Sequence, residues 1–424
     1  MRDLFRVTAL VMIFAFLFVP LSACGDGDDM DINVSSDTLR VKRVENIPDG
    51  FIFGMDASCV PSLEAGGVKY YDHEGAERDV YAILAENGIN YIRVRVWNDP
   101  FDENGKGYGG GNCDIDNAVE IGKRATENGM KLLVNFHYSD FWADPAKQMV
   151  PKAWLGMSIE EKTDALYNYT KDSLYSLIAA DVDVGMVQIG NETNGAMCGE
   201  SDWENIASLM SAGSRAVREV CPEALVAVHF TNPERVGSYA YYSESLDKYG
   251  VDYDVFASSY YPFWHGTLEN LSGELGGVAK KYGKMVMIAE TSYAYTPSDT
   301  DFYGNTVGGA GTTIKGYPFS VQGQADLVRD VIAAAVSIEN CIGVFYWEGT
   351  WIAAGGNSYE ENLALWEKHG SGWASSYAAE YDPEDAGKWY GGCAVDNQAF
   401  FDKNGKALES LKVFILVREG NLDS

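Results

Sequence analysis

Two glutamates of this 424-residue chain stand where short apolar runs end: Glu192 follows Asn191 after one run, and Glu290 ends a later one. Two carboxyl groups can divide an acid–base reaction between them when one stays protonated and the other ionised. Set among aromatic side chains that can stack on sugar rings, such a pair fits the hydrolysis of a glycosidic bond. Taken singly, each glutamate could be a structural ion-pair partner. The pair together, with Asn191 before Glu192, favours catalysis.

Other polar and aromatic residues stand at the ends of the same kind of run, so they are candidates for the same site. Their types, which include arginine, histidine, tyrosine and tryptophan, suit the binding of a sugar and the control of a carboxylate. These residues are Asp56, Arg93, Arg95, Trp97, His137, Tyr138, Asp140, Trp142, His229, Tyr260, Tyr261, Trp347 and Glu348.

The elements that must position these residues are eight short β-rich runs separated by amphipathic stretches. One such stretch has apolar Val80, Ile83 and Leu84 at helical spacing with Gly88 as a stop, and in another Asp114 can cap a helix. Eight strands alternating with helices predict an α/β fold, a single (β/α)8 barrel, in which the active site lies at the carboxyl ends of the strands. The runs are 51–56, 90–97, 131–137, 185–191, 224–230, 254–260, 284–290 and 342–348.

Composition and charge exclude some functions. The chain has 32 Lys and Arg against 62 Asp and Glu, a net charge of −30, which argues against a nucleic-acid partner because a basic surface is needed there. A doubly wound dinucleotide-binding sheet is the competing fold, but the glycines at 109–111 lack the spacing of its phosphate turn. We expect one catalytic domain over residues 47–424.

The first residues have the pattern of an export signal. Arg2 and Arg6 precede an apolar run, 7–19, that is too short to span a membrane, and Leu21-Ser22-Ala23-Cys24 resembles a bacterial lipobox. We therefore expect a lipoprotein signal peptide at 1–23, lipidation of Cys24 and an acidic flexible tether at 24–46. A plain signal peptide with an incidental cysteine is the alternative. The acidic run after Cys24 indicates an exported lipoprotein of the outer membrane and cell surface.

Six cysteines remain after Cys24: Cys59, Cys113, Cys198, Cys221, Cys341 and Cys393. In an exported protein they could form disulfides, but six cysteines allow fifteen complete pairings, and the sequence does not choose among them. Free buried thiols are equally compatible with a large barrel.

Six stretches spread over the chain carry a resemblance to a known family. They are FGMDAS (53–58), NYIRVRVWNDP (90–100), NFHYSDFWADPAKQMVPKAW (135–154), VQIGNETNGAM (187–197), IAETSYAYT (288–296) and WASSYAAEYDPEDAGKWYGG (373–392). Through them the chain resembles glycoside hydrolase family 53, the endo-β-1,4-galactanases of the retaining clan A. The resemblance implies a retaining endo-hydrolase of galactan, including type I arabinogalactan, with Glu192 as acid/base and Glu290 as nucleophile. It also implies that Asn191 holds the 2-hydroxyl group of the sugar, and that the partners are galactan and galacto-oligosaccharides, with no organic cofactor. A monomer is the default expectation for a tethered depolymerase.

The resemblance implies further roles in the cleft. Arg93 would orient the nucleophile and Tyr260 would hydrogen-bond to it. The remaining substrate-binding candidates are Asp56, His137 and His229 with Trp347 around the cleavage point, and Trp142, Asp144, Lys147 and Trp389 along the cleft. Each of these aromatic residues could instead serve core packing.

The resemblance also implies a structural Ca²⁺ in the loop after the seventh strand. Asp299, Asp301 and Asn305 alternate there as oxygen donors, which suits a hard cation. The backbone of Cys393 and the side chain of Asp396 would complete the site. Tyr303 stands where the family usually has a histidine ligand, so backbone or water would have to substitute. A solvated acidic turn is the alternative.

Two other functions remain compatible with the sequence. The chain could be a clan relative that cuts another β-1,4-glycan such as xylan or mannan, or a surface glycan-binding lipoprotein without turnover. Both candidate carboxylates are present, and this counts against the second of these.

Overall fold

Eight parallel strands close into a barrel in the order β1 to β8, with β8 pairing with β1. This computed structural model describes residues 38–309, 311–356 and 358–421, so the predicted signal peptide and Cys24 lie outside the described residues. The (β/α)8 fold is confirmed. The strands are β1 (Ile52–Asp56), β2 (Tyr91–Val96), β3 (Lys131–Phe136), β4 (Val184–Ile189), β5 (Leu225–Phe230), β6 (Val255–Ser259), β7 (Met285–Glu290) and β8 (Cys341–Tyr346).

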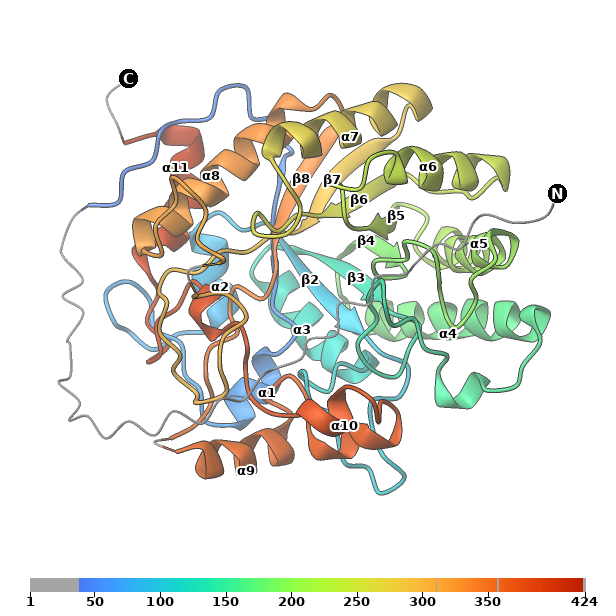
Figure 1. The fold of residues 1–424 in the computed structure, drawn as a ribbon, viewed down its shortest axis with the longest axis horizontal. Helices are drawn as coiled ribbons and strands as arrows, with labels where there is room; N and C mark the ends of the chain where they lie inside the picture. The colour runs from blue at the N-terminus through green and yellow to red at the C-terminus, as the bar shows by residue number, and fades with distance from the viewer. Residues whose placement is uncertain (1–37, 310, 357, 422–424) are drawn as a thin grey trace. The chain divides into compact units, whose positions relative to one another are not determined.

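Helices surround the barrel, with α9 and α10 together at one edge of the molecule (Figure 1). None of the described helices is long and apolar enough to cross a membrane. The helices are α1 (Val60–Ala65), α2 (Val80–Glu86), α3 (Ile115–Glu127), α4 (Ile159–Ala179), α5 (Trp203–Val220), α6 (Ser238–Lys248), α7 (Leu268–Tyr282), α8 (Val321–Ser337), α9 (Tyr359–His369), α10 (Ala386–Trp389) and α11 (Val413–Glu419). Short 3₁₀ helices are η1 (Lys152–Trp154), η2 (Ser376–Glu380), η3 (Asp396–Gln398) and η4 (Glu409–Lys412).

The helix signals in the sequence act as expected. The Asp114 side chain accepts a hydrogen bond from the backbone N–H of Asn117 and so caps α3. Asp79 caps α2 in the same way, and Gly88 follows that helix with a positive φ of 92°. These local signals set the lengths of the helices that separate neighbouring strands.

Two apolar layers hold the barrel. The interior is filled by a small cluster that includes Leu133, Met186, Met287 and Phe345, and a larger cluster lies between strands and helices. A Cβ on Gly54 in β1 would lie 2.0 Å from the Phe345 ring, so only glycine leaves that ring its place in the interior. The filled interior makes a rigid support for the residues at the carboxyl ends of the strands.

The compact unit begins earlier than the sequence indicates. It starts at Leu39, and Leu39, Val41 and Val44 are buried against it. The backbone N–H of Val44 donates to the carbonyl of Val417 near the end of the chain. The predicted boundary of the tether at residue 46 is therefore corrected: residues 39–46 belong to the barrel unit because their alternating apolar side chains pack on it.

Candidate active site

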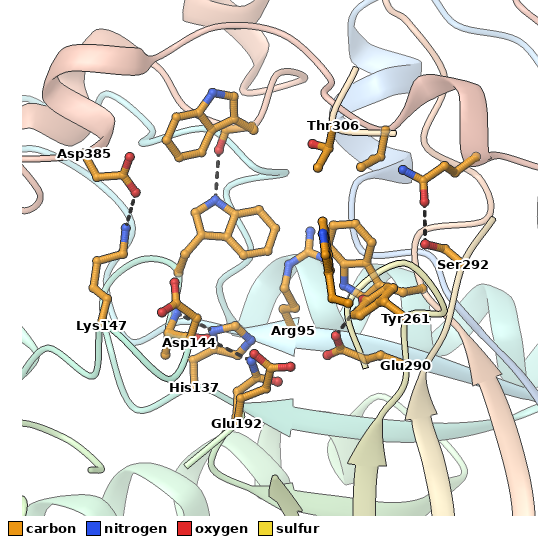
Figure 2. A pocket seen from close by; sticks show the side chains of 18 of the residues that line it. Arg95, His137, Asp144, Lys147, Glu192, Tyr261, Glu290, Ser292, Thr306 and Asp385 are labelled. Atoms are coloured by element: carbon orange, nitrogen blue, oxygen red, sulfur yellow. Dashed lines mark hydrogen bonds and ion pairs between the residues drawn. The ribbon is translucent and has the colours of Figure 1, made fainter. Parts of the chain in front are cut away.

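A cavity of about 330 Å³ opens at the carboxyl ends of the strands, where the barrel fold predicts the active site. Figure 2 shows the carboxyl groups of Glu192 and Glu290 on opposite sides of its lower part. Predicted residues that line it with them are His137, Trp142, Asp144, Lys147, Asn191 and Trp347.

Glu290 is the last residue of β7, and two donors hold its carboxylate. Arg93 Nη2 lies 2.8 Å from Oε1, and the Tyr261 hydroxyl donates to Oε2 at 2.9 Å. These two contacts fix the position of the Glu290 carboxyl group. An ionised carboxylate held at the cavity floor is suited to act as a nucleophile.

Glu192 follows β4 by three residues and has a positive φ of 47°, an uncommon backbone conformation for a glutamate. Burial raises the pKa of its carboxyl group to about 8, and the negative charge of Glu290 adds to the effect. The proton therefore stays on Glu192 at neutral pH, where Glu290 is ion-paired. This difference between the two carboxyl groups is the one that acid catalysis with a nucleophile requires.

A buried network beneath the cavity fixes these groups. Arg93 donates to Asp56 and to the side-chain oxygen of Asn191, each at 3.0 Å. That Asn191 oxygen also accepts from Asn135 at 3.0 Å, and the Asn191 amide nitrogen donates to the carbonyl of Ala143 at 2.9 Å. Asn191 is thus held at the cavity wall beside Glu192, the place expected for binding a substrate hydroxyl.

The tyrosine prediction was wrong by one residue. Tyr260 is buried, and its hydroxyl donates to the carbonyl of Gly266 at 3.0 Å, whereas Tyr261 reaches Glu290. Val255 and Ala257 of β6 face the barrel interior, whereas Phe256 belongs to the cluster outside the barrel. Regular alternation along this strand therefore places Ser259 and Tyr261 inside and Tyr260 outside.

Four further predicted substrate-binding residues do not line the cavity. Arg93 is fully buried and contacts Glu290 in place of a sugar. Asp56 is fully buried between Arg93 and Arg95, so it supports the arginines instead of touching a sugar. His229 is also fully buried. Trp389 is 42% exposed outside the cavity lining, and its carbonyl accepts from the indole of Trp373, which lines the cavity in its place.

Arg95, a candidate from its place near a strand end, lines the cavity wall. It lies two residues after Arg93 on β2, a spacing that puts both side chains on one face. Its guanidinium lies 4.4 Å from the Trp142 ring centroid, and it forms buried ion pairs with Glu348 and Asp56. Phe263, Trp264, Trp373 and Asp385 also line the cavity; they stand in loops, where no periodic pattern marks them.

The predicted calcium residues come together. Single carboxylate oxygens of Asp299, Asp301 and Asp396 lie within 4.8 Å of one another. Oδ1 of Asp396 and Oδ1 of Asn305 are buried without a hydrogen-bond partner. Burial and the charge of Asp396 raise the pKa of Asp301 to about 8. Clustered carboxyl groups with unpartnered oxygens fit a hard divalent cation.

Two members of the predicted calcium set have other contacts. The Tyr303 hydroxyl accepts from the Trp373 indole at 2.6 Å and donates to the carbonyl of Trp389, so the phenol is engaged elsewhere, and backbone or water would have to take the place of the histidine ligand. The backbone N–H of Cys393 donates to Asp301 Oδ2 at 2.5 Å and orients that carboxylate. The side chains that fit a cation are thus those of Asp299, Asp301, Asn305 and Asp396, and the expected backbone ligand from Cys393 stays a prediction.

The cysteines of the barrel are free thiols. Among the described residues, all six are buried and none is paired in a disulfide. Burial raises the pKa of the thiols, of Cys113 for example to about 12, which leaves them protonated and unreactive.

Comparisons with known proteins support a glycoside hydrolase active site at this cavity. The sequence model of glycosyl hydrolase family 53 matches residues 52–414. The chain is 58% identical over 389 residues to the "Endo-beta-1,4-galactanase" of Bacillus subtilis (strain 168), covering 91% of this chain and 90% of that protein. It is 33% identical to the "Arabinogalactan endo-beta-1,4-galactanase" of Humicola insolens, covering 70% and 89%. The solved GH53 catalytic domain of Ignisphaera aggregans superposes with a TM-score of 0.80 at 39% identity, over 89% of this chain and 99% of that one.

Proposed function

We propose, since the chain belongs to glycosyl hydrolase family 53, that it is a retaining endo-hydrolase of the β-1,4-galactosidic bonds of galactan and type I arabinogalactan. The observation that carries this function is the carboxyl pair at the cavity floor, with one group ion-paired and the other kept protonated. The cavity opens to the surface between loops, as cleavage within a polymer requires.

The first half of the reaction uses both carboxyl groups. Glu290 attacks the anomeric carbon with its ionised oxygen, while Glu192 gives its proton to the glycosidic oxygen of the leaving chain. The carbon–oxygen bond breaks, and a galactosyl ester forms on Glu290. Arg93 and Tyr261 hold the Glu290 carboxylate in place for this attack.

The second half reverses the role of Glu192. Once Glu290 is esterified it carries no charge, so one of the causes that raise the pKa of Glu192 is removed, although burial remains. Glu192 then takes a proton from water, and the hydroxide oxygen attacks the anomeric carbon and frees Glu290. Two inversions leave the product in the β configuration.

Purified protein should be assayed on soluble galactan, mannan and xylan, with proton NMR of the first products. We expect galactan alone to be shortened, through products of intermediate length, with the β-anomer appearing first. Turnover of xylan or mannan without galactan would favour the clan relative. Binding of galactan without turnover would favour the glycan-binding protein.

We further propose that Ca²⁺ binds Asp299, Asp301, Asn305 and Asp396. These residues lie in or beside the segment that brings Thr306 to the cavity wall, so the ion would stabilise one wall of the cleft. The unpartnered oxygens of Asn305 and Asp396 and the repulsion between the carboxylates support this proposal.

Removal of calcium should lower the melting temperature of the enzyme by about a few degrees, because a ligand that binds only the native state stabilises it by mass action. A chelator provides the measurement and added Ca²⁺ the reversal. Asp301→Ala should melt lower than the wild type and no longer respond to chelator. An unchanged wild-type melting temperature, with no calcium found by metal analysis, contradicts the site.

We also propose that the protein is an exported lipoprotein anchored through Cys24, on the strength of the Leu-Ser-Ala-Cys sequence after the apolar run. In the producing cell, an alkyne fatty acid should label the wild type and should not label Cys24→Ala, which should leave the membrane fraction or stay unprocessed. Cys221→Ser is the matched control and should remain labelled. A wild type without label rules out the anchor.

A further inference from the structure

A serine and a histidine form a hydrogen-bonded chain that leads to the carboxyl group of Glu192. Ser259 is the last residue of β6, and its hydroxyl lies 2.6 Å from Glu192 Oε1. His229 is on β5, and its Nε2 lies 2.9 Å from the Ser259 oxygen. Both residues are fully buried, so water does not compete for these hydrogen bonds.

The direction of each hydrogen bond follows from the fixed donors around His229. The backbone N–H of Glu192 donates to His229 Nδ1 at 3.3 Å, and the Gln188 amide lies 3.0 Å from the same nitrogen. The Asn191 side-chain oxygen also lies 3.2 Å from Nδ1, but it already accepts from Arg93 and Asn135. Because the backbone N–H of Glu192 can only donate, Nδ1 accepts, and the hydrogen of the neutral ring is on Nε2. Burial and the charge of Arg93 hold the pKa of His229 well below its usual value, which keeps the ring neutral.

It follows that Nε2 donates to the Ser259 oxygen, and the serine must direct its own hydrogen at Glu192 Oε1. Oε1 is then always an acceptor. When Glu192 is protonated, its carboxyl proton must therefore be on the other oxygen, Oε2.

We propose that His229 and Ser259 are positioning residues that reserve Oε1 of Glu192 as an acceptor and so keep the transferable proton on Oε2. This inference rests on the proposed role of Glu192 as acid/base. The same chain serves both halves of the reaction: it fixes the acid when Glu192 is protonated, and it donates to the carboxylate when Glu192 acts as base.

The titratable groups that face Glu192 come from every neighbouring element. Glu290 on β7 and Asp144 after β3 raise its pKa, as burial does most strongly, and Ser259 lowers it. Tyr239 of α6 and Tyr261 after β6 also interact with its charge. Ser259 is a direct hydrogen-bond donor to Glu192, so its loss should move the pKa upward.

The test is the pH profile of Ser259→Ala on galactan. We expect kcat to fall about 10- to 100-fold, since one charge-assisted hydrogen bond is lost, and KM to change little. The alkaline limb of kcat/KM should move up by about one pH unit. Cleavage of an aryl β-galactobioside with an acidic leaving group, which needs no proton in the first step, should keep its kcat/KM.

Ser258→Ala is the matched control, because Ser258 is equally buried on the same strand, and its hydroxyl contacts Tyr239 and the backbone carbonyl of Ser259 but not Glu192. It should have the wild-type pH profile. If Ser259→Ala does not fold, Ser259→Thr can be compared with Ser259→Val. Threonine and valine have the same shape, but only threonine has a hydroxyl group that can donate to Glu192.

A wild-type profile in Ser259→Ala or Ser259→Val overturns the inference, and so does the same change in Ser258→Ala. Glu192→Ala separates this result from failure of the proposed function. If that variant loses activity on galactan but retains it on the activated galactobioside, Glu192 is the acid/base, and only the serine–histidine chain has failed.

Discussion

Glu290→Ala should lower kcat on galactan by about 10⁴-fold or more, because removal of a nucleophile that acts with other groups abolishes nearly the whole catalytic advantage. The loss should be the same on polymer and on an activated aryl galactobioside, since both need the attack on the anomeric carbon. Initial rates on the two substrates provide the measurement.

Azide gives this prediction its control. In Glu290→Ala it can enter the space of the lost carboxylate and attack the anomeric carbon directly, and the expected product is the α-galactosyl azide. Wild-type enzyme should form none, and an exposed change such as Glu223→Ala should leave activity unaltered. A Glu290→Ala enzyme of undiminished activity would show that another group is the nucleophile.

Glu192→Ala should lose about 10²- to 10⁴-fold on galactan, the usual contribution of a general acid–base group. The loss should be much smaller for formation of the galactosyl ester from an activated substrate, because its leaving group departs without a proton. Burst kinetics with the aryl galactobioside measure this difference, since the ester should then accumulate.

Azide should rescue Glu192→Ala with the opposite stereochemistry. It attacks the accumulated galactosyl ester without needing a base, so the product should be the β-galactosyl azide. Equal losses on polymer and activated substrate, with no azide product, would contradict the acid/base role of Glu192.

The pH dependence of the wild type follows from the raised pKa of Glu192, about 8. The protonated form is needed for cleavage of galactan, so kcat/KM should be maintained below this pKa and should fall as pH rises through it. Glu192→Ala should lack that alkaline limb on the activated substrate. A limb that persists there belongs to another group.

The barrel and the carboxyl pair could be predicted from the sequence. The barrel follows from the alternation of β-rich runs with helical stretches, and the pair follows from the position of each glutamate at the end of a run. Eight runs at regular spacing can close only in a few ways, and residues at the ends of parallel strands meet at one mouth. Glu192 and Glu290 line the predicted cavity for this reason. Arg93 reaches Glu290 because it stands on the interior face of β2.

One error had a signal in the sequence: alternation along β6 from Val255 and Ala257 puts Tyr261, and not Tyr260, on the interior face, where it reaches Glu290. The other errors arose where tertiary contacts override a local pattern. Trp373 replaces Trp389 in the cavity wall because long loops fold back over the mouth. Leu39 and Val41 pack on the barrel although they follow an acidic stretch that reads as a tether.

During turnover Glu290 should carry a galactosyl ester, formed with proton donation from Glu192. A 2-deoxy-2-fluoro-galactobioside with an activated leaving group should trap this ester. The fluorine slows both formation and hydrolysis of the ester, and the activated leaving group restores the rate of formation only, so the ester accumulates. Peptide mapping by mass spectrometry then identifies the labelled residue. We predict a single label on the peptide that contains Glu290. A label on a different carboxylate, or an enzyme that turns over galactan while taking no label, would contradict the mechanism.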